Sequence, residues 1–411
     1  MSPPAPEDRS VRSARPAGDR TLSSKRPSGA VVEWVTPEQA EFYRNVLEFA
    51  RSLPDDTRRR DREGAFSRDL WDRIGRFGIP GLPAPDEYGG GGADVVTTML
   101  ALEALGYGCA DNGLVFSVNA HMWTTVVTVA AYGTDQQKEK WLPGLCSGEL
   151  IGCHTITEPG AGSDAFGMTS TARPVEGGYE LNGRKTFITN APVADLIIVF
   201  ARTSPEAIGS FGISAFLVPK GHPGCIVEPA ADKMGLRTSP MSDVVLDDCL
   251  VPADVLLGHE GQGGEIFQTS MRWERACIMA SQVGMMRRIM ESCVRYARQR
   301  KQFGKPIAKY ESVADKIANM KIAVEASRQL VLRVGWLMDH GLDTMMDAAV
   351  AKAYVSEAAV QTTLDAVQVH GGYGYMTELE IERAVRDAVG GRIYSGTSEI
   401  QRRVIARGLG L

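Results

Sequence analysis

The stretch Thr157-Glu158-Pro159-Gly160-Ala161-Gly162-Ser163-Asp164 places two glycines and a serine just before a β-prone segment. Glycine has no Cβ, so the backbone N–H groups of such a turn can approach a phosphate closely, and the Ser163 hydroxyl offers one more donor. Most glycine-rich turns are only turns. These residues by themselves therefore leave two interpretations open, a phosphate-binding loop and a plain turn.

Around this stretch, between about residues 151 and 257, short β-prone runs alternate with turn residues. Residues 196–200 and 213–218 are continuous apolar runs of strand length, and Asn182-Gly183 is a strong signal for a β-hairpin. We therefore predict a compact all-β domain in the middle of the chain.

On both sides of the β segment, apolar residues recur at helical spacing. On the N-terminal side this holds from about Thr36 to Leu150, with Pro37 near the start of a predicted helix. On the C-terminal side three long helices are predicted, which commonly form an antiparallel bundle. They cover residues 264–301, 309–340 and 344–369.

Residues 1–30 are rich in Ser, Pro and Arg and contain no aromatic residue. Such a segment cannot bury enough surface to offset its ordering entropy, so we predict a disordered tail. The predicted architecture is α+β. Its parts are the tail at 1–30, a helical domain at 31–150, a β domain at 151–262 and a helical bundle at 263–411.

The composition argues against several classes of function. A net charge of −5 over 411 residues gives no basic field for nucleic acid. We find no apolar run of the ~20 residues that a membrane span needs. The seven cysteines and six histidines are dispersed without metal-ligand spacing, and scattered cysteines are typical of a reducing compartment. We expect a cytoplasmic protein without a metal and without nucleic acid or membrane as partner.

A second block, Ile393-Tyr394-Ser395-Gly396-Thr397-Ser398-Glu399-Ile400-Gln401, lies far along the chain. Together, these two blocks resemble the phosphate-binding loop and the active-site loop of the acyl-CoA dehydrogenase flavoenzymes. The resemblance covers about residues 35–411. It implies an N-terminal helical domain, a middle β-barrel domain, a C-terminal four-helix bundle and FAD as cofactor. It also implies α,β-dehydrogenation of a saturated acyl thioester to the 2-enoyl thioester, in fatty-acid or secondary metabolism.

Lys185-Thr186-Phe187-Ile188-Thr189-Asn190 resembles the strand that carries the flavin in this family. The ring of Phe187 offers a flat partner for the isoalloxazine, and the resemblance places Thr189 at flavin N5. It also places Thr157 on the flavin ring and Ser163 on the pyrophosphate. Taken alone, residues 187 and 189 also suit a core phenylalanine and an ordinary strand threonine. The full set that the resemblance assigns to FAD is His154, Ile156, Thr157, Gly162, Ser163, Phe187, Thr189, Arg300, Gln302, Phe303, Gln368, Gly371, Gly372, Thr397 and Glu399.

Residues 298–306, Arg-Gln-Arg-Lys-Gln-Phe-Gly-Lys-Pro, close the first long C-terminal helix. Cations at a helix C-terminus usually complement the helix dipole, which is the plain interpretation. The segment also resembles the one with which a subunit of this family reaches its neighbour's FAD, through Arg300 and Gln302. Gln368 and Gly371-Gly372 resemble residues that complete that shared site. The resemblance therefore implies a homo-oligomer, a homotetramer built as a dimer of dimers.

Ser395 stands where most of this family carries the glutamate that removes the substrate's α-proton. A serine hydroxyl is too weak a base, and no histidine lies near it in sequence. Glu274, in Arg272-Trp273-Glu274-Arg275-Ala276, aligns with the helix-borne base of the isovaleryl-CoA and long-chain acyl-CoA dehydrogenases. We predict that Glu274 is the base, because this step needs a carboxylate of raised pKa. The alternative is a surface carboxylate paired with Arg272 or Arg275.

In the family the backbone N–H at position 395, within the Ser395–Gly396 loop, polarises the thioester carbonyl. Arg272, Arg275 and Ser163 are the predicted substrate-binding residues. Arg272 replaces an acidic residue that often contacts the pantetheine arm, so both acyl-CoA and acyl-carrier-protein substrates stay open. An electron-transfer flavoprotein or oxygen would reoxidise FAD. Two other functions also stay open: a divergent flavin enzyme of the same fold (oxidase, N-hydroxylase or desulfinase) and an inactive flavin-binding scaffold.

Overall fold

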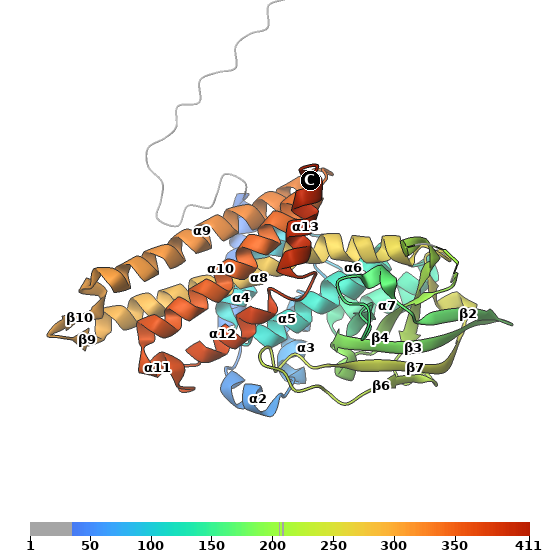
Figure 1. Ribbon diagram of the computed structural model, residues 1–411, viewed down its shortest axis with the longest axis horizontal. Helices are drawn as coiled ribbons and strands as arrows, with labels where there is room; N and C mark the ends of the chain where they lie inside the picture. The colour runs from blue at the N-terminus through green and yellow to red at the C-terminus, as the bar shows by residue number, and fades with distance from the viewer. Residues whose placement is uncertain (1–34, 205, 208) are drawn as a thin grey trace, which may run out of the picture.

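A computed structural model describes residues 35–204, 206–207 and 209–411 (Figure 1). The predicted disordered tail, residues 1–30, lies outside the described residues. Helices fill the first part of the described chain, strands the middle part, and long helices the last part. In Figure 1 the long helices α8, α9 and α10 run alongside one another, and the sheet lies at one end of the molecule.

The first helices begin at capping residues that are visible in the sequence. The Thr36 hydroxyl accepts a hydrogen bond from the Gln39 N–H, and the Gln39 side chain accepts one from the Thr36 N–H. This capping box, followed by Pro37 in the first turn, fixes the start of α1. The helices of this part are α1 (Pro37–Ser52), α2 (Thr57–Glu63), α3 (Arg68–Phe77), α4 (Val95–Gly108), α5 (Asn112–His121), α6 (Val127–Tyr132) and α7 (Asp135–Ser147).

One stretch of this part is more apolar than we expected. Helix α5, the π-helical turn η2 (Met122–Val126) and α6 form one continuous helix, Asn112–Tyr132, which is long and apolar enough to span a membrane. The expectation that no apolar run reaches this length is therefore wrong. However, 83% of its most apolar window is buried inside the protein, where it contacts β1 and α8. Burial against other elements accounts for its apolar residues.

Eight strands form a single sheet in the order β6-β7-β3-β2-β4-β5-β8, and β1 pairs with β4 in parallel. The predicted strands at 196–200 and 213–218 are confirmed as β4 and β5, which pair antiparallel along their whole length. The strands are β1 (Gly152–Thr155), β2 (Thr171–Val175), β3 (Gly178–Thr189), β4 (Leu196–Arg202), β5 (Ile213–Pro219), β6 (Cys225–Val227), β7 (Met241–Pro252) and β8 (Leu256–Leu257).

The hairpin predicted at Asn182-Gly183 is wrong. Both residues lie inside β3, and the turn between β2 and β3 falls at residues 176–177. At Gly183 (φ 147°) the register between β3 and β7 shifts, and an added Cβ would lie 2.2 Å from the Ser170 hydroxyl oxygen. Asn-Gly here serves a β-bulge and a close approach, which have the same local sequence signal as a turn.

The three long C-terminal helices are confirmed, and the first of them joins the two halves of the molecule. The first turns of α8 belong to a buried cluster shared with the sheet, whereas its later residues lie in the large core shared with α4, α9 and α10. The helices are α8 (Gly263–Gln299), α9 (Glu311–Asp339), α10 (Met345–His370), α11 (Gly372–Tyr375), α12 (Ile381–Gly390) and α13 (Ser398–Gly408), and a small hairpin, β9 (Lys301–Gln302) and β10 (Lys305–Pro306), follows α8.

Candidate active site

Glu274 lies on α8 where the helix passes from the sheet-side cluster, which includes Met271, into the bundle core, which includes Ala276. Its side chain is buried, with 7% of the residue exposed. The Ser395 hydroxyl donates to its Oε1 at 2.6 Å. Its other oxygen, Oε2, is buried and has no hydrogen-bond partner in the described part of the chain.

Burial raises the pKa of Glu274, and the Ser395 hydrogen bond and the positive charges of Arg275 and Lys352 offset only part of this rise. A buried carboxylate of raised pKa with one free oxygen is suited to accept a proton. The alternative of a surface carboxylate does not agree with its burial.

The two flanking arginines differ in their surroundings. Arg272 is exposed, whereas Arg275 is partly buried, and burial lowers the pKa of its guanidinium. The Arg275 Nε–H points at the Ser395 carbonyl oxygen, 3.5 Å away. Arg275 therefore contacts the active-site loop, while Arg272 is free to meet a ligand from solvent.

The loop that carries Ser395 has an uncommon backbone. Ser395 (φ 55°) and Gly396 (φ 84°) are consecutive residues in the left-handed region, which is costly for a serine. The Gln401 amide donates to both of their carbonyl oxygens, at 3.0 and 2.8 Å, and the Lys352 ammonium donates to the Gly396 carbonyl at 2.6 Å. The surrounding side chains thus hold the loop in a conformation that it would not adopt alone.

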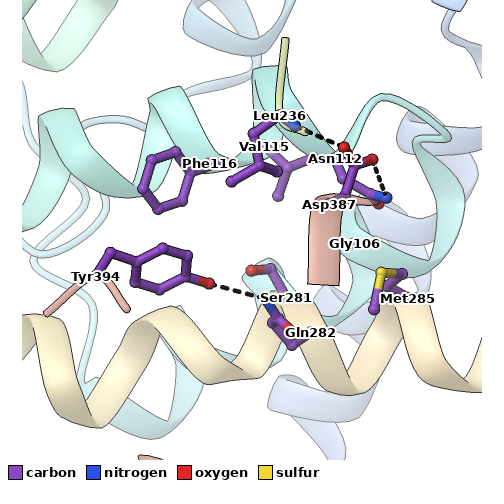
Figure 2. Close-up of a pocket in the computed structure, with 10 residues that line it drawn as sticks. All are labelled: Gly106, Asn112, Val115, Phe116, Leu236, Ser281, Gln282, Met285, Asp387 and Tyr394. Carbon is purple, nitrogen blue, oxygen red and sulfur yellow. Dashed lines mark hydrogen bonds between the residues drawn. The ribbon is translucent and has the colours of Figure 1, made fainter. Parts of the chain in front are cut away.

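A small cavity lies behind this loop (Figure 2). In Figure 2 the Tyr394 hydroxyl faces the Gln282 amide, which donates to it at 2.7 Å, and Asp387 accepts from Asn112 and from the Leu236 N–H. The cavity measures about 20 Å³, whereas small-molecule sites usually measure about 300–1,000 Å³. It is therefore too small to be a substrate site, and among its polar residues Gln282 holds the Tyr394 hydroxyl.

The segments predicted to bind the flavin lie next to one another. The Thr186 N–H donates to the Thr157 carbonyl at 2.9 Å, which joins the glycine-rich loop to the end of β3. An added Cβ at Gly160 or Gly162 would meet nothing within 4 Å. Packing within the chain therefore does not require glycine there, whereas close approach of a phosphate to the backbone would. Ser163 is exposed on the same loop.

Phe187 is exposed at an irregular point of β3. The register between β3 and β7 shifts between Lys185 and Ile188, and Phe187 between them adopts φ 59° and is 67% exposed. The strained backbone holds an apolar ring in solvent, and stacking against a flat ligand would cover that ring. Thr189, two residues on, is half-buried. These residues fit an isoalloxazine ring, and a core phenylalanine does not agree with the exposure.

His154 and Ile156 line the inner side of the same loop. Ile156 belongs to the buried cluster that contains Met271, one turn before Glu274. Burial lowers the pKa of His154 to about 4, so the ring is neutral at physiological pH, and its Nδ1 has no partner in the described residues. An unpaired buried nitrogen next to the predicted flavin loop is compatible with a polar ligand.

Three further residues predicted to bind FAD lie away from the sheet: Arg300, Gln302 and Phe303. They occupy the β9–β10 hairpin, which Figure 1 shows at the opposite end of the molecule from the sheet. Phe303 is 93% exposed at φ 50°. The Arg300 guanidinium stacks over the Tyr373 ring at 5.7 Å, which brings the hairpin close to Gly371-Gly372. Gln368, near the end of α10, is exposed.

Thr397 and Glu399 have a structural role that the sequence did not indicate. Thr397 caps α13, and its hydroxyl accepts a hydrogen bond from the Ile400 N–H at 3.3 Å. Glu399 is exposed in the first turn of that helix, and hydrogen bonds at the helix start lower its pKa. A carboxylate there also complements the helix dipole. Neither role prevents contact with a cofactor.

The sequence interpretation missed the residues that support the site. Glu158 accepts hydrogen bonds from the buried Lys185 ammonium at 2.7 Å, and from the N–H and hydroxyl groups of Thr169 and Ser170. Lys352 was also missed. Both lysines are completely buried, and the available signal for Lys352 was its place within the apolar run of residues 348–355.

Three family models match consecutive parts of the chain. They are the acyl-CoA dehydrogenase N-terminal domain over residues 36–149, the middle domain over 153–249 and the C-terminal domain over 261–410.

Relatives match over nearly their whole length. The chain is 41% identical over 374 residues to the L-prolyl-[peptidyl-carrier protein] dehydrogenase of Serratia sp. (strain ATCC 39006), covering 91% of this chain and 97% of that protein. The solved structure of the prolyl acyl carrier protein oxidase AnaB has a TM-score of 0.90 at 44% identity, covering 92% and 100% of the two chains. PigA with FAD and proline has a TM-score of 0.90 at 40% identity, covering 92% and 98%. This protein belongs to the acyl-CoA dehydrogenase family.

Proposed function

We propose that this protein is an FAD-dependent dehydrogenase that converts a saturated acyl thioester into the 2-enoyl thioester, with Glu274 as the base for the α-proton. The observation that carries this proposal is the state of Glu274: a buried carboxylate of raised pKa with one oxygen held by Ser395 and the other free. FAD, when bound, supplies the acceptor for the hydride that leaves the β-carbon.

The protein's own groups prepare the substrate for loss of the proton. Ser395 holds Oε1 of Glu274, so the lone pairs of Oε2 are available to the α-hydrogen. In the described part of the chain, the N–H groups of Ser395 and Gly396 donate to no protein acceptor. Backbone donors of this kind stabilise negative charge on a thioester oxygen as it develops. The helix thus supplies the base that removes the α-proton, and the loop supplies the donors that stabilise the enolate oxygen.

The acyl group we propose is a small aminoacyl group, in the first instance prolyl, attached to a carrier protein. The carrier-protein dehydrogenase and the carrier-protein oxidase described above support this class, since both are named for prolyl substrates. Arg272 supports it as well: an exposed cation beside the base suits the phosphate of a phosphopantetheine arm. CoA carries the same arm, so the experiment has to separate the two carriers.

An anaerobic substrate screen tests this function. Prolyl-carrier protein is expected to bleach the oxidised flavin of the purified holoprotein within seconds, and prolyl-CoA, butyryl-CoA and isovaleryl-CoA more slowly or not at all. Flavin absorbance in a stopped-flow instrument measures this. Bleaching by a simple acyl-CoA alone would reassign the substrate, and no bleaching by any thioester would support the inactive scaffold.

The electron acceptor is a second point to test, because the relatives include both a carrier-protein dehydrogenase, at 41% identity, and a carrier-protein oxidase, at 44% identity. If oxygen is the acceptor, air admitted to the reduced protein restores the flavin absorbance together with stoichiometric hydrogen peroxide. Reduced flavin that persists in air until an electron-transfer flavoprotein is added would identify a dehydrogenase.

We propose further that the cofactor is shared between two chains. Phe187 and the β9–β10 hairpin both fit FAD by their exposed aromatic residues, yet Phe187 belongs to the sheet, and the hairpin lies at the opposite end of the molecule from the sheet (Figure 1). A single FAD can meet both only if a second copy supplies the hairpin, in an arrangement with two-fold symmetry. We propose a dimer as the smallest active unit and a dimer of dimers as the assembly.

Hybrid dimers test the shared site. Glu274→Gln and the double variant Arg300→Ala/Gln302→Ala are each expected to be inactive. After denaturation and co-refolding with FAD, a random mixture should regain about one quarter of wild-type activity, because half of the dimers are hybrids and each hybrid has one intact site. If each chain binds FAD alone, the mixture stays as inactive as its components.

A further inference from the structure

Lys352 is a completely buried lysine that faces the active-site loop. It lies on α10, its side chain has no exposed surface, and its ammonium donates to the Gly396 carbonyl oxygen at 2.6 Å. Its Nζ also lies 5.9 Å from the centre of the Tyr394 ring. Among the described residues, no carboxylate forms a salt bridge with it within 4 Å. Burying an ammonium in this way costs several kcal/mol, so the position demands an explanation.

The carbonyl that Lys352 holds belongs to the strained turn that presents Ser395 to Glu274. The peptide group is planar, so fixing the Gly396 carbonyl limits the rotation of the turn as a whole. Gln401 holds the same oxygen at 2.8 Å and the Ser395 oxygen at 3.0 Å. Ser395 in turn donates to Glu274 at 2.6 Å. A chain of contacts therefore runs from the ammonium, through the turn, to the carboxylate.

Lys352 also acts on Glu274 through its charge. Burial lowers the pKa of Lys352 to about 8, against the opposing influence of Glu274, so the group carries its charge at neutral pH. In return, its charge offsets part of the rise in the pKa of Glu274. The other charged groups that influence it are Arg275 on α8, Glu357 on α10 and Glu399 on α13.

We propose that Lys352 is a positioning residue for Glu274: its buried ammonium holds the Gly396 carbonyl, keeps the Ser395 hydroxyl on the carboxylate, and places a positive charge beside it. This inference rests on the proposed role of Glu274 as the base. Among the described residues, the Lys352 ammonium donates to the Gly396 carbonyl and not to Glu274, so it acts through the loop and through its charge. A lysine that served only to fill space between α10 and the loop would not influence the protonation of Glu274, and this difference can be measured.

The test compares Lys352→Met, which removes donor and charge, with Lys352→Gln, which removes the charge but keeps a donor. The first readout is the rate of anaerobic flavin reduction across pH. The second is the carboxyl band in difference infrared spectra of the resting holoprotein, identified by its loss in Glu274→Gln. The infrared titration reports the protonation of Glu274 without turnover. Lys316→Met is the matched control. Lys316 lies on α9 and pairs with Asp365 of α10, the helix that carries Lys352, but it does not contact the loop.

Lys352→Met is expected to bind FAD as the wild type does and to reduce it about 10–100-fold more slowly, because misplacement of a catalytic group is costly. In both variants the infrared titration of Glu274 should move to higher pH, because a neighbouring positive charge is lost. Lys316→Met should match the wild type in both readouts.

An infrared titration of Glu274 that is unchanged in Lys352→Met would overturn the proposal, whatever the rate. If Lys352→Met does not fold, an unchanged titration in Lys352→Gln overturns it equally. Failure of the proposed function would show separately, because no thioester would then bleach the flavin of the wild-type protein. The infrared titration of Glu274 can still be measured in that case.

Discussion

Glu274→Gln is expected to slow thioester-dependent flavin reduction by about 10²–10⁴-fold, the usual contribution of a positioned general base. Glutamine keeps the shape and can still accept the Ser395 hydrogen bond through its carbonyl oxygen, but it cannot take a proton. FAD content and the unfolding temperature should stay near wild type, since the substitution removes a buried acid without leaving a cavity. Stopped-flow absorbance with prolyl-carrier protein measures the rate.

The same helix offers the control. Glu265→Gln changes an exposed glutamate in the first turn of α8 and should leave the rate unchanged. The pH profile adds a second check. The carboxylate must be ionised to act, and burial raises its pKa, so the wild-type rate should rise with pH through that raised pKa. A Glu274→Gln variant that bleaches at the wild-type rate would show that another group is the base.

Lys185→Met is expected to lower the free energy of unfolding by about 3–5 kcal/mol, because it leaves the Glu158 carboxylate buried without its counter-charge. The two groups meet at 2.7 Å, and their side chains are 0% and 4% exposed. Glu158 follows Thr157 directly and therefore fixes the glycine-rich loop to β3. FAD binding should weaken together with stability. Urea unfolding and FAD titration by fluorescence measure the two effects.

Two comparisons separate the buried pair from ordinary surface charge. Arg184→Met, on the same strand, breaks a partly exposed ion pair with Asp243 and should cost less than about 1 kcal/mol. The double variant Glu158→Gln/Lys185→Met should be more stable than Lys185→Met alone, because it leaves no unpaired buried charge. If the double variant loses as much unfolding free energy as Glu158→Gln and Lys185→Met lose together as single variants, the ion pair is not the cause of the destabilisation.

The pair also predicts a response to acid. Burial alone would raise the pKa of Glu158, but the charge of Lys185 and the hydrogen bonds from Ser170 and Thr169 outweigh it and lower this pKa to about 2, from an ordinary value of 4.5. A carboxyl whose pKa is lower in the folded state stabilises the fold above its unfolded pKa. This stabilisation is therefore complete above about pH 4.5 and is lost as the pH falls towards 2.

Local signals in the sequence were reliable where local physics decides the structure. The helix start near Pro37, the apolar runs of β4 and β5 and the lengths of α8, α9 and α10 all appear in the structure as predicted. Asn182-Gly183 misled because a turn and a bulge need the same freedom at glycine. Only the approach of Ser170 from another segment distinguishes them.

The sequence by itself determined the family, the order of helical and β parts, the cofactor class and the absence of the usual glutamate at Ser395. Tertiary structure alone decided that Glu274 is buried, that Ser395 binds one of its oxygens across 121 residues of chain, and that Lys352 holds the loop between them. The physical reason is that the protonation of a carboxyl depends on its burial and on its neighbours. Those neighbours come from α8, α10 and the loop before α13, which only folding brings together.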